Sequence, residues 1–161
     1  MREWLVGSAL IESPEGILLV QNRRRGGIVD WSPPGGVIDE GEELLTGLAR
    51  EVEEETGLVV TEWHGPLYEI DATAPGLGWH LRVEVWSAAA FSGELAIGDP
   101  DGIVVDARFV PVEECCGLVQ SNHPWVVEPL VEYLGRRWKG SRRFGYQVNG
   151  ERLAELVVTR L

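Results

Sequence analysis

The chain has 161 residues, of which 44% are hydrophobic and 25% are charged. This size and composition are typical of one globular domain and exclude a fibrous or disordered protein. The longest apolar runs, at residues 17–20 and 88–91, are too short to cross a membrane, and the first residues show no secretory signal, so we expect a cytoplasmic protein without membrane contact. The formal net charge of −12 would repel phosphate backbones, which argues against stable nucleic-acid binding but leaves room for small anions that carry divalent cations.

The first part of the chain alternates strands with turns rich in glycine and proline. Residues 4–12 and 17–22 have the composition of strands, and Ser13-Pro14-Glu15-Gly16 between them is typical of a hairpin turn. A basic loop at residues 23–27 follows. The segment Trp31-Ser32-Pro33-Pro34-Gly35-Gly36 then predicts a rigid turn.

An amphipathic helix is expected at residues 42–56, ended by Gly57 in a left-handed conformation. A rotation of about 100° per residue divides its side chains into two stripes. The apolar stripe consists of Leu45, Leu48, Ala49 and Val52. The acidic stripe beside it consists of Glu51, Glu54 and Glu55.

The rest of the domain is expected to add more strands and more helix. Residues 58–70 predict one or two strands, residues 79–91 and 104–110 predict one strand each, and a loop rich in proline and glycine is expected at 71–78. A short helical turn is predicted at 111–117 and a helix at 124–137. Strands interrupted by two main helices predict an α+β fold in which a mixed β-sheet is sandwiched between helices.

The two cysteines of this region, Cys115 and Cys116, are neighbours in the sequence. A disulfide between adjacent residues would be strained. We therefore expect two reduced thiols in or near the core, as is usual in the cytosol.

Residues 139–161 are expected to form a C-terminal extension to a domain at residues 1–138. Residues 143–148 and 151–161 predict a hairpin around an Asn149-Gly150 turn, and a helix at 151–157 is the alternative. The role of the extension stays open between an added pair of strands at the sheet edge, a lid, and a contact that would build a homodimer.

The segment from Gly36 to Leu58, GVIDEGEELLTGLAREVEEETGL, carries the main chemical signal. Five residues separate Gly36 from Glu42, seven separate Glu42 from Arg50, and the run REVEEETGL follows without a break. Carboxylates on one helical face repel one another unless a cation offsets them, and hard divalent cations prefer such oxygen ligands. An acidic run by itself is more often a solvated face. The glycines, Glu42 and Arg50 at these spacings favour a metal site instead.

This spacing resembles the Nudix box, with the pattern Gx5Ex7REUxEExGU in which U is aliphatic, and every specified position matches. The resemblance covers about residues 4–134 and implies the Nudix fold, an α/β/α sandwich. It implies a MutT-like hydrolase that cleaves a nucleoside diphosphate linked to another moiety, by attack of water at phosphorus. The implied cofactor is Mg²⁺, with Mn²⁺ as a substitute. The implied metal residues are Glu51, Glu54, Glu55, Gly36 and Glu42, where Glu42 is either a ligand or a supporting partner.

The resemblance also implies catalytic roles for four side chains. Glu51 and Glu54 act with the metal, and Arg50 orients a glutamate, since it lies four residues before Glu54. Many members of the family add an acidic residue from a loop after the long strand. Asp99, Asp101 and Asp106 are the candidates, and Asp101 is favoured, although an Asp-Pro-Asp-Gly segment is often only a turn.

Candidate substrate-binding residues flank the box. Arg23 and Arg25 have guanidinium groups suited to phosphate, but three consecutive arginines are also compatible with a plain surface loop. Trp31 can stack on a base or simply support its proline-rich turn. Asn122 can read a purine edge, as in some relatives, but capping of the helix at Pro124 is the better-supported alternative. His64, His80 and His123 lack metal-ligand spacing.

The sequence leaves the substrate open. Hydrolysis of nucleoside triphosphates is slightly favoured over hydrolysis of ADP-ribose or another nucleotide sugar, because of Asn122 and the short, single-domain chain. Pro75 lies near but not at the position that ADP-ribose enzymes of the family often use. A non-catalytic domain that senses a nucleotide is the alternative from another class. The complete set of box carboxylates disfavours it. In each case the expected partner is a small nucleotide.

Overall fold

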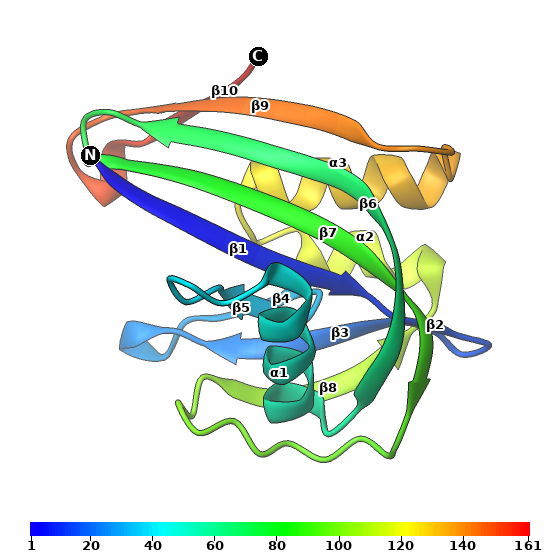
Figure 1. Ribbon diagram of the computed structural model, residues 1–161. Coiled ribbons are helices and arrows are strands. Elements are labelled where there is room, and N and C mark those ends of the chain that lie inside the picture. The colour runs from blue at the N-terminus through cyan, green and yellow to red at the C-terminus, as the bar shows by residue number, and fades with distance from the viewer.

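The computed structural model describes residues 1–161 as two β-sheets and three α-helices (Figure 1). The strands are β1 (Arg2–Leu10), β2 (Glu12–Ser13), β3 (Gly16–Arg23), β4 (Val29–Ser32), β5 (Gly35–Val37), β6 (Val59–Ala74), β7 (Trp79–Ser92), β8 (Val104–Val110), β9 (Arg142–Asn149) and β10 (Val157–Arg160). The helices are α1 (Leu44–Thr56), α2 (Val112–Val119) and α3 (Pro124–Arg136), with short 3-10 turns η1 (Arg25–Gly27) and η2 (Leu153–Glu155). None of the helices is long and apolar enough to cross a membrane.

The larger sheet has six strands in the order β10-β9-β6-β7-β1-β5. It is mixed, because β1 runs parallel to β7 and β6 runs parallel to β9, whereas the other neighbours are antiparallel. The smaller sheet is antiparallel, and its β3 pairs with β2, β4 and β8. A mixed sheet with three helices confirms the predicted α+β class. The strands form two sheets, however, where the sequence predicted one.

Strand β3 is central because it is buried on both faces. Its run Ile17-Leu18-Leu19-Val20 is at most 1% exposed. Ile17 and Leu19 join the main core cluster, while Leu18 joins a second cluster with Leu48 and other residues around α1. A strand packed on both faces has a continuous apolar run rather than an alternating one, and each such side chain contributes about 1.5–3 kcal/mol.

The helices lie on different sides of the large sheet. Helix α3 contacts β6 and β9, and α2 packs beside it, while α1 contacts β1, β5 and β6 (Figure 1). Helix α1 begins at Leu44 rather than at Glu42, because Gly41 adopts a positive φ of 82° and Glu43 is extended. It ends as predicted at Gly57, which has a φ of 79° and donates its N–H to the Glu53 carbonyl at 2.9 Å.

Strand β6 is longer than the sequence predicts. Residues 71–74, placed in a loop by their composition, continue the strand, since Ala74 pairs with Trp79 on β7 and Thr73 pairs with Gln147 on β9. Ala72 and Ala74 are fully buried there. The turn is confined to residues 75–78.

The C-terminal segment forms the predicted hairpin with a longer connection. Strands β9 and β10 pair antiparallel with Val157 opposite Asn149, but residues 150–156 link them, including η2, in place of a two-residue Asn-Gly turn. Since β9 pairs with β6, the hairpin extends the large sheet at its edge. The division into a domain and an extension remains a prediction.

Candidate active site

A cavity of about 530 Å³ lies between the two sheets, the start of α3 and the acidic face of α1. Its acidic part is formed by Glu51 and Glu55 of α1 together with Asp99 and Asp101 of the loop before β8. Its apolar part is formed by residues of β6, β7 and α3, namely Tyr68, Ile70, Leu81, Val83, Val85, Trp125 and Val126. One cavity therefore combines a charged region with a region suited to a flat organic group.

Glu55 is the most buried carboxylate of the site. It is 8% exposed and accepts a hydrogen bond from the backbone N–H of Gly35 at 3.1 Å. Burial, reinforced by the charges of Glu51, Asp99 and Glu54, raises the pKa of Glu55 to about 8, although the Gly35 bond opposes this. An ionised carboxylate at this position is therefore unfavourable until a positive charge approaches.

Glu51 lies against the backbone of β5. A Cβ atom at Gly36 would come within 2.6 Å of the Glu51 carboxylate carbon, so any larger residue there would push this carboxylate away from its present position. Burial raises the pKa of Glu51, and the charges of Glu54 and Asp101 act in the same direction, whereas Arg50 opposes them. The presence of glycine at position 36, the first residue of the predicted box, is thus explained by the space that Glu51 occupies.

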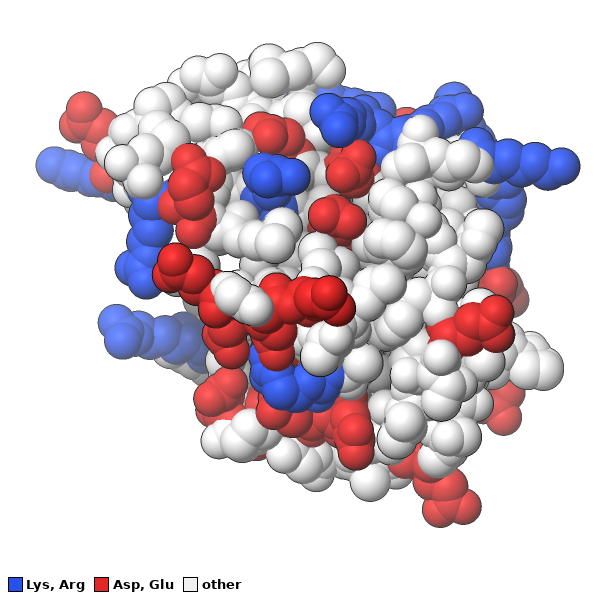
Figure 2. Space-filling model, in the orientation of Figure 1, with Lys and Arg blue, Asp and Glu red and all other residues white.

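Arg50 does not line the cavity, but it links three glutamates, of which Glu51 does. Its Nε and Nη2 atoms donate to the two carboxylate oxygens of Glu42, each at 3.1 Å, and its Nη1 donates to Glu51 and Glu54 at 3.3 Å. The fork geometry is the strong form of this ion pair. These bonds hold the side chains of Glu42, Glu51 and Glu54 in place around Arg50. Figure 2 shows a group of acidic side chains over α1 and the preceding loop.

The donor set fits a hard divalent cation in its chemistry. Glu51, Glu54 and Glu55 supply only oxygen donors, and the burial of two of them favours a compensating positive charge. Glu54 is turned toward Arg50 and does not line the cavity, and no three acidic, histidine or cysteine side chains are gathered into a complete metal cluster. A cation held here would take its remaining ligands from water and substrate phosphate, as Mg²⁺ usually does.

The three candidate aspartates of the loop and β8 have different environments. Asp99 accepts hydrogen bonds from the backbone N–H groups of Asp101, Ile103 and Val104 and so holds the turn together. Asp106 pairs with Arg108 at 3.2 Å and does not line the cavity. Asp101 lines the cavity, and its carboxylate has no hydrogen bond to the protein. Of the three aspartates, Asp101 is therefore the one that lines the cavity with a carboxylate not bonded to the protein.

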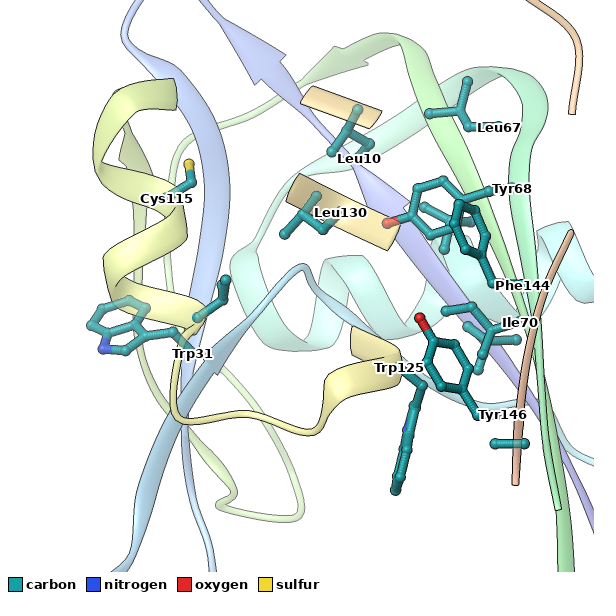
Figure 3. Packing of buried hydrophobic residues seen from close by; sticks show 14 of the residues in the cluster. Leu10, Trp31, Leu67, Tyr68, Ile70, Cys115, Trp125, Leu130, Phe144 and Tyr146 are labelled. Carbon is teal, nitrogen blue, oxygen red and sulfur yellow. The ribbon is translucent and has the colours of Figure 1, made fainter. Parts of the chain in front are cut away.

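The structure contradicts a base-stacking role for Trp31. Its side chain is 7% exposed and packs in the core beside α2, and it does not line the cavity (Figure 3). Its outer ring face is covered by the Arg108 guanidinium at 4.6 Å. The other interpretation, in which the tryptophan supports its turn and strand, is the one that the structure favours.

The arginine loop contributes a different residue from those predicted. Arg23 and Arg25 do not line the cavity, while Arg24 lines it and is held by Asp30 at 2.9 Å. Val20 and Asn22 also line the cavity, so the residues that face it are alternate positions of one extended segment. That alternation was the signal in the sequence that would have selected Arg24 and Asn22.

Asn122 lines the cavity and does not cap α3. Its side-chain amide donates to the Trp31 carbonyl at 3.0 Å, and its oxygen accepts from the His123 backbone N–H at 2.8 Å. The N-cap residue is His123, without a side-chain cap bond. The expected capping role is therefore wrong, and Asn122 instead ties the loop before α3 to β4 with one amide hydrogen left for another partner.

Two aromatic cavity residues were not singled out as substrate-binding from the sequence. His123 stacks on Trp125 with ring centroids 4.3 Å apart and planes at 8°, and both line the cavity. Burial lowers the pKa of His123, so the imidazole is favoured in its neutral form. No sequence pattern predicts the stacking of His123 on Trp125.

Comparison with known proteins agrees with this architecture. A family model described as the NUDIX domain matches residues 1–135. An RNA pyrophosphohydrolase from Bradyrhizobium sp. (strain ORS 278) is 34% identical over 123 residues, which cover 65% of this chain and 72% of that protein. Nudix hydrolase 7 from Arabidopsis thaliana is 46% identical over 56 residues, but the match spans only 20% of that protein's length.

A solved structure gives the same fold. The MutT NUDIX hydrolase from Burkholderia pseudomallei superimposes with a TM-score of 0.67 and 23% identity, over 82% of this chain and 98% of that one. The fold and the carboxylate-bearing helix define a hydrolase of the Nudix class. This chain belongs to the Nudix family, whose hydrolases generally use divalent metal ions and act on small nucleotide substrates.

Proposed function

We propose that this chain hydrolyses a pyrophosphate bond of a nucleotide with Mg²⁺, for which Mn²⁺ can substitute. The observation that carries the proposal is the single cavity in which the carboxylates of Glu51 and Glu55 meet an apolar region large enough for a base. In this arrangement the phosphates lie beside α1 and the base lies toward β6 and α3. The family membership supports the reaction class.

Glu51, Glu54 and Glu55 would hold the cation, which neutralises phosphate charge and activates water when it is bound. Gly36 leaves the space beside its Cα that the Glu51 carboxylate occupies, and this is the role that we propose for it. Glu42 acts through Arg50 and not as a ligand, because both of its oxygens are engaged by the guanidinium. Asp101 is free to accept the proton of the attacking water or to add an oxygen ligand.

Arg50 is assigned a positioning role. It contacts Glu51 and Glu54 at 3.3 Å and does not line the cavity. A guanidinium in this place fixes the rotamers of two glutamates and remains protonated, since the pKa of Arg50 is raised by its hydrogen bond with Glu42. Its effect on the reaction therefore passes through those carboxylates.

Among substrates we favour a nucleoside triphosphate, cleaved as in MutT-like enzymes. The relatives named RNA pyrophosphohydrolase raise a second candidate, the 5′-triphosphate end of an RNA. The net charge of −12 disfavours extended contact with an RNA backbone, whereas a mononucleotide presents only the groups that fit the cavity. ADP-ribose hydrolysis and nucleotide sensing without turnover rank below these two candidates.

A panel assay tests the proposal. Nucleoside triphosphates, ADP-ribose, dinucleoside polyphosphates and a 5′-triphosphorylated RNA oligonucleotide are incubated with Mg²⁺, and the products are resolved by chromatography. We expect a mononucleotide triphosphate to be the best substrate, with cleavage at a pyrophosphate bond. If only the RNA is hydrolysed, the 5′-triphosphate end of RNA replaces the mononucleotide as the proposed substrate. If no compound of the panel is hydrolysed, the proposed enzymatic activity is refuted.

A pair of variants tests the site. Glu54→Gln should lower kcat at least about 100-fold while the melting temperature stays close to that of the parent. Glu53→Gln is the matched control, because Glu53 is an exposed neighbour on the same helix and removes the same charge. Equal activity of the two variants would show that Glu54 is wrongly assigned.

A further inference from the structure

The hydroxyl of Tyr68 is a polar group that the fold leaves without a protein partner. Tyr68 is 2% exposed, lines the cavity, and makes no hydrogen bond through its hydroxyl to another residue. No side-chain nitrogen or oxygen that is sealed from solvent lacks a partner in this protein. The Tyr68 hydroxyl must therefore open into the cavity that the residue lines, and Figure 3 shows its ring extending from β6 toward Leu130 of α3 with the oxygen leading.

The position of this hydroxyl is fixed by packing. The Tyr68 ring contacts Phe144 and Trp138 edge-on, with centroids 5.9 and 6.2 Å away, and Tyr133 lies at 6.1 Å. An aromatic ring held on several sides keeps its direction without a hydrogen bond. A hydroxyl that opens into the cavity can bond to water there, and a ligand that displaces this water must offer a polar atom in its place or lose the hydrogen bond.

The strand register places the Tyr68 backbone far from the strand that contacts the acidic helix. Tyr68 pairs with Val85 on β7, Val85 pairs with Ser8 on β1, and Ser8 pairs with Gly35 on β5. Three strand spacings separate the backbones of Tyr68 and Gly35, which is about 14 Å. Because Gly35 donates to Glu55, Tyr68 stands at the opposite end of the cavity from the carboxylates.

The rest of the cavity surface that β6 and β7 supply is apolar. The other cavity residues of β6 and β7 are Ile70, Leu81, Val83 and Val85. Tyr68 is therefore the one side chain of these two strands that offers a hydrogen-bonding group to the cavity. In a small apolar pocket, a single placed polar group sets the orientation of a ligand and discriminates among ligands.

We propose that Tyr68 is a specificity-determining residue whose hydroxyl forms a hydrogen bond to a polar atom on the base of the bound nucleotide. This inference rests on the proposed function, since it takes the phosphates to lie at the acidic end. Burial raises the pKa of Tyr68, so the hydroxyl stays protonated and donates at any pH at which the enzyme works.

The test compares Tyr68→Phe with Tyr146→Phe. Both variants lose one phenolic oxygen from the same core cluster, but the Tyr146 hydroxyl is bonded to Glu128 at 2.9 Å and Tyr146 does not line the cavity. We expect Tyr68→Phe to raise KM for the best nucleoside triphosphate about 5- to 10-fold with kcat changed less than about 2-fold. Tyr146→Phe should leave both constants near those of the parent, and melting curves verify that each variant is folded.

A substrate without a base isolates the effect. Inorganic tripolyphosphate carries the phosphates alone, and the binding of this probe should be the same in Tyr68→Phe and in the parent. Equal KM values for the nucleotide in both tyrosine variants would overturn the inference. So would a parallel loss of affinity for tripolyphosphate, because Tyr68 would then act on the phosphates.

Failure of the proposed function is distinguishable from failure of this inference. If the parent hydrolyses no nucleotide, titration calorimetry with the same nucleoside triphosphates still measures whether Tyr68→Phe weakens binding at least about 5-fold relative to Tyr146→Phe. Such a result would support the role of Tyr68 in a binding protein. Absence of nucleotide binding to the parent would refute both.

Discussion

The substitution Glu55→Gln should stabilise the metal-free protein at alkaline pH while it impairs the metal site. Glu55 has a pKa of about 8 in the folded protein against 4.5 for an unperturbed glutamate. A tenfold change in proton affinity is worth about 1.4 kcal/mol, so ionising this buried carboxyl costs the folded state about 3–5 kcal/mol. Glutamine has nearly the same shape, carries no charge, and keeps an oxygen to accept the Gly35 N–H.

The direction of the pH dependence follows from proton binding. Between pH 4.5 and about 8 the folded protein retains a proton on Glu55 that the unfolded chain releases. The contribution of this group to stability is therefore present at low pH, is lost as pH rises through that window, and changes no further above it. In Glu55→Gln this loss is absent.

Urea unfolding followed by tryptophan fluorescence, at several pH values from 5 to 9 with a chelator present, measures the effect. Glu53→Gln is the control, because it removes one exposed charge from the same helix and so accounts for the general effect of net charge. We expect Glu55→Gln to exceed this control by about 3–5 kcal/mol in free energy of unfolding at pH 9, and by little at pH 5. Parallel pH profiles for the two variants would refute the assignment of the buried charge to Glu55.

Two further predictions concern the cavity wall. Asp101→Asn should lower kcat about 10-fold, a smaller loss than for Glu54→Gln. The control Asp106→Asn should change steady-state kinetics little, because Asp106 pairs with Arg108. Normal rates for Asp101→Asn would show that Asp101 has no role in the reaction. Arg24→Ala should raise KM about 10-fold with a small change in kcat. The control Arg25→Ala should match the parent, since Arg24 lines the cavity and Arg25 does not. Equal KM values for the two variants would exclude Arg24 from substrate binding.

The acidic helix α1 was predictable because its determinants are local. Spacings of three and four residues put Glu51, Glu54 and Glu55 on one side whatever the rest of the chain does. The stop at Gly57 follows equally from the conformational freedom of glycine. The helix starts two residues later than predicted because Gly41 turns the chain and Glu43 is extended, and Glu42 bonds to Arg50 from outside the helix.

The substrate end was not predictable because it depends on strand register. Tyr68 and Gly35 are 33 positions apart in the sequence but lie in one row across four strands. No pattern in the sequence fixes that row, since it requires β1 to insert between β5 and β7. The sequence leaves Trp31 open between stacking on a base and supporting its turn for a similar reason, since the face of β4 that it occupies depends on contact with α2.

The distribution of charge around Arg50 explains why the site needs a cation in addition to an arginine. Arg50 lies within 3.6 Å of carboxylate oxygens of Asp39, Glu42, Glu51 and Glu54. One positive charge shared among four carboxylates leaves an excess of negative charge on the helix face and the preceding loop. Arg50 has no contact with Glu55, whose ionisation is opposed by burial and by neighbouring acids. A cation that binds at Glu55 must displace its proton at neutral pH, so metal affinity should rise as pH increases toward 8. Burial of Glu55 thus lowers the stability of the metal-free protein when the carboxyl ionises. For the same reason, a cation that binds to the ionised carboxylate raises the free energy of unfolding.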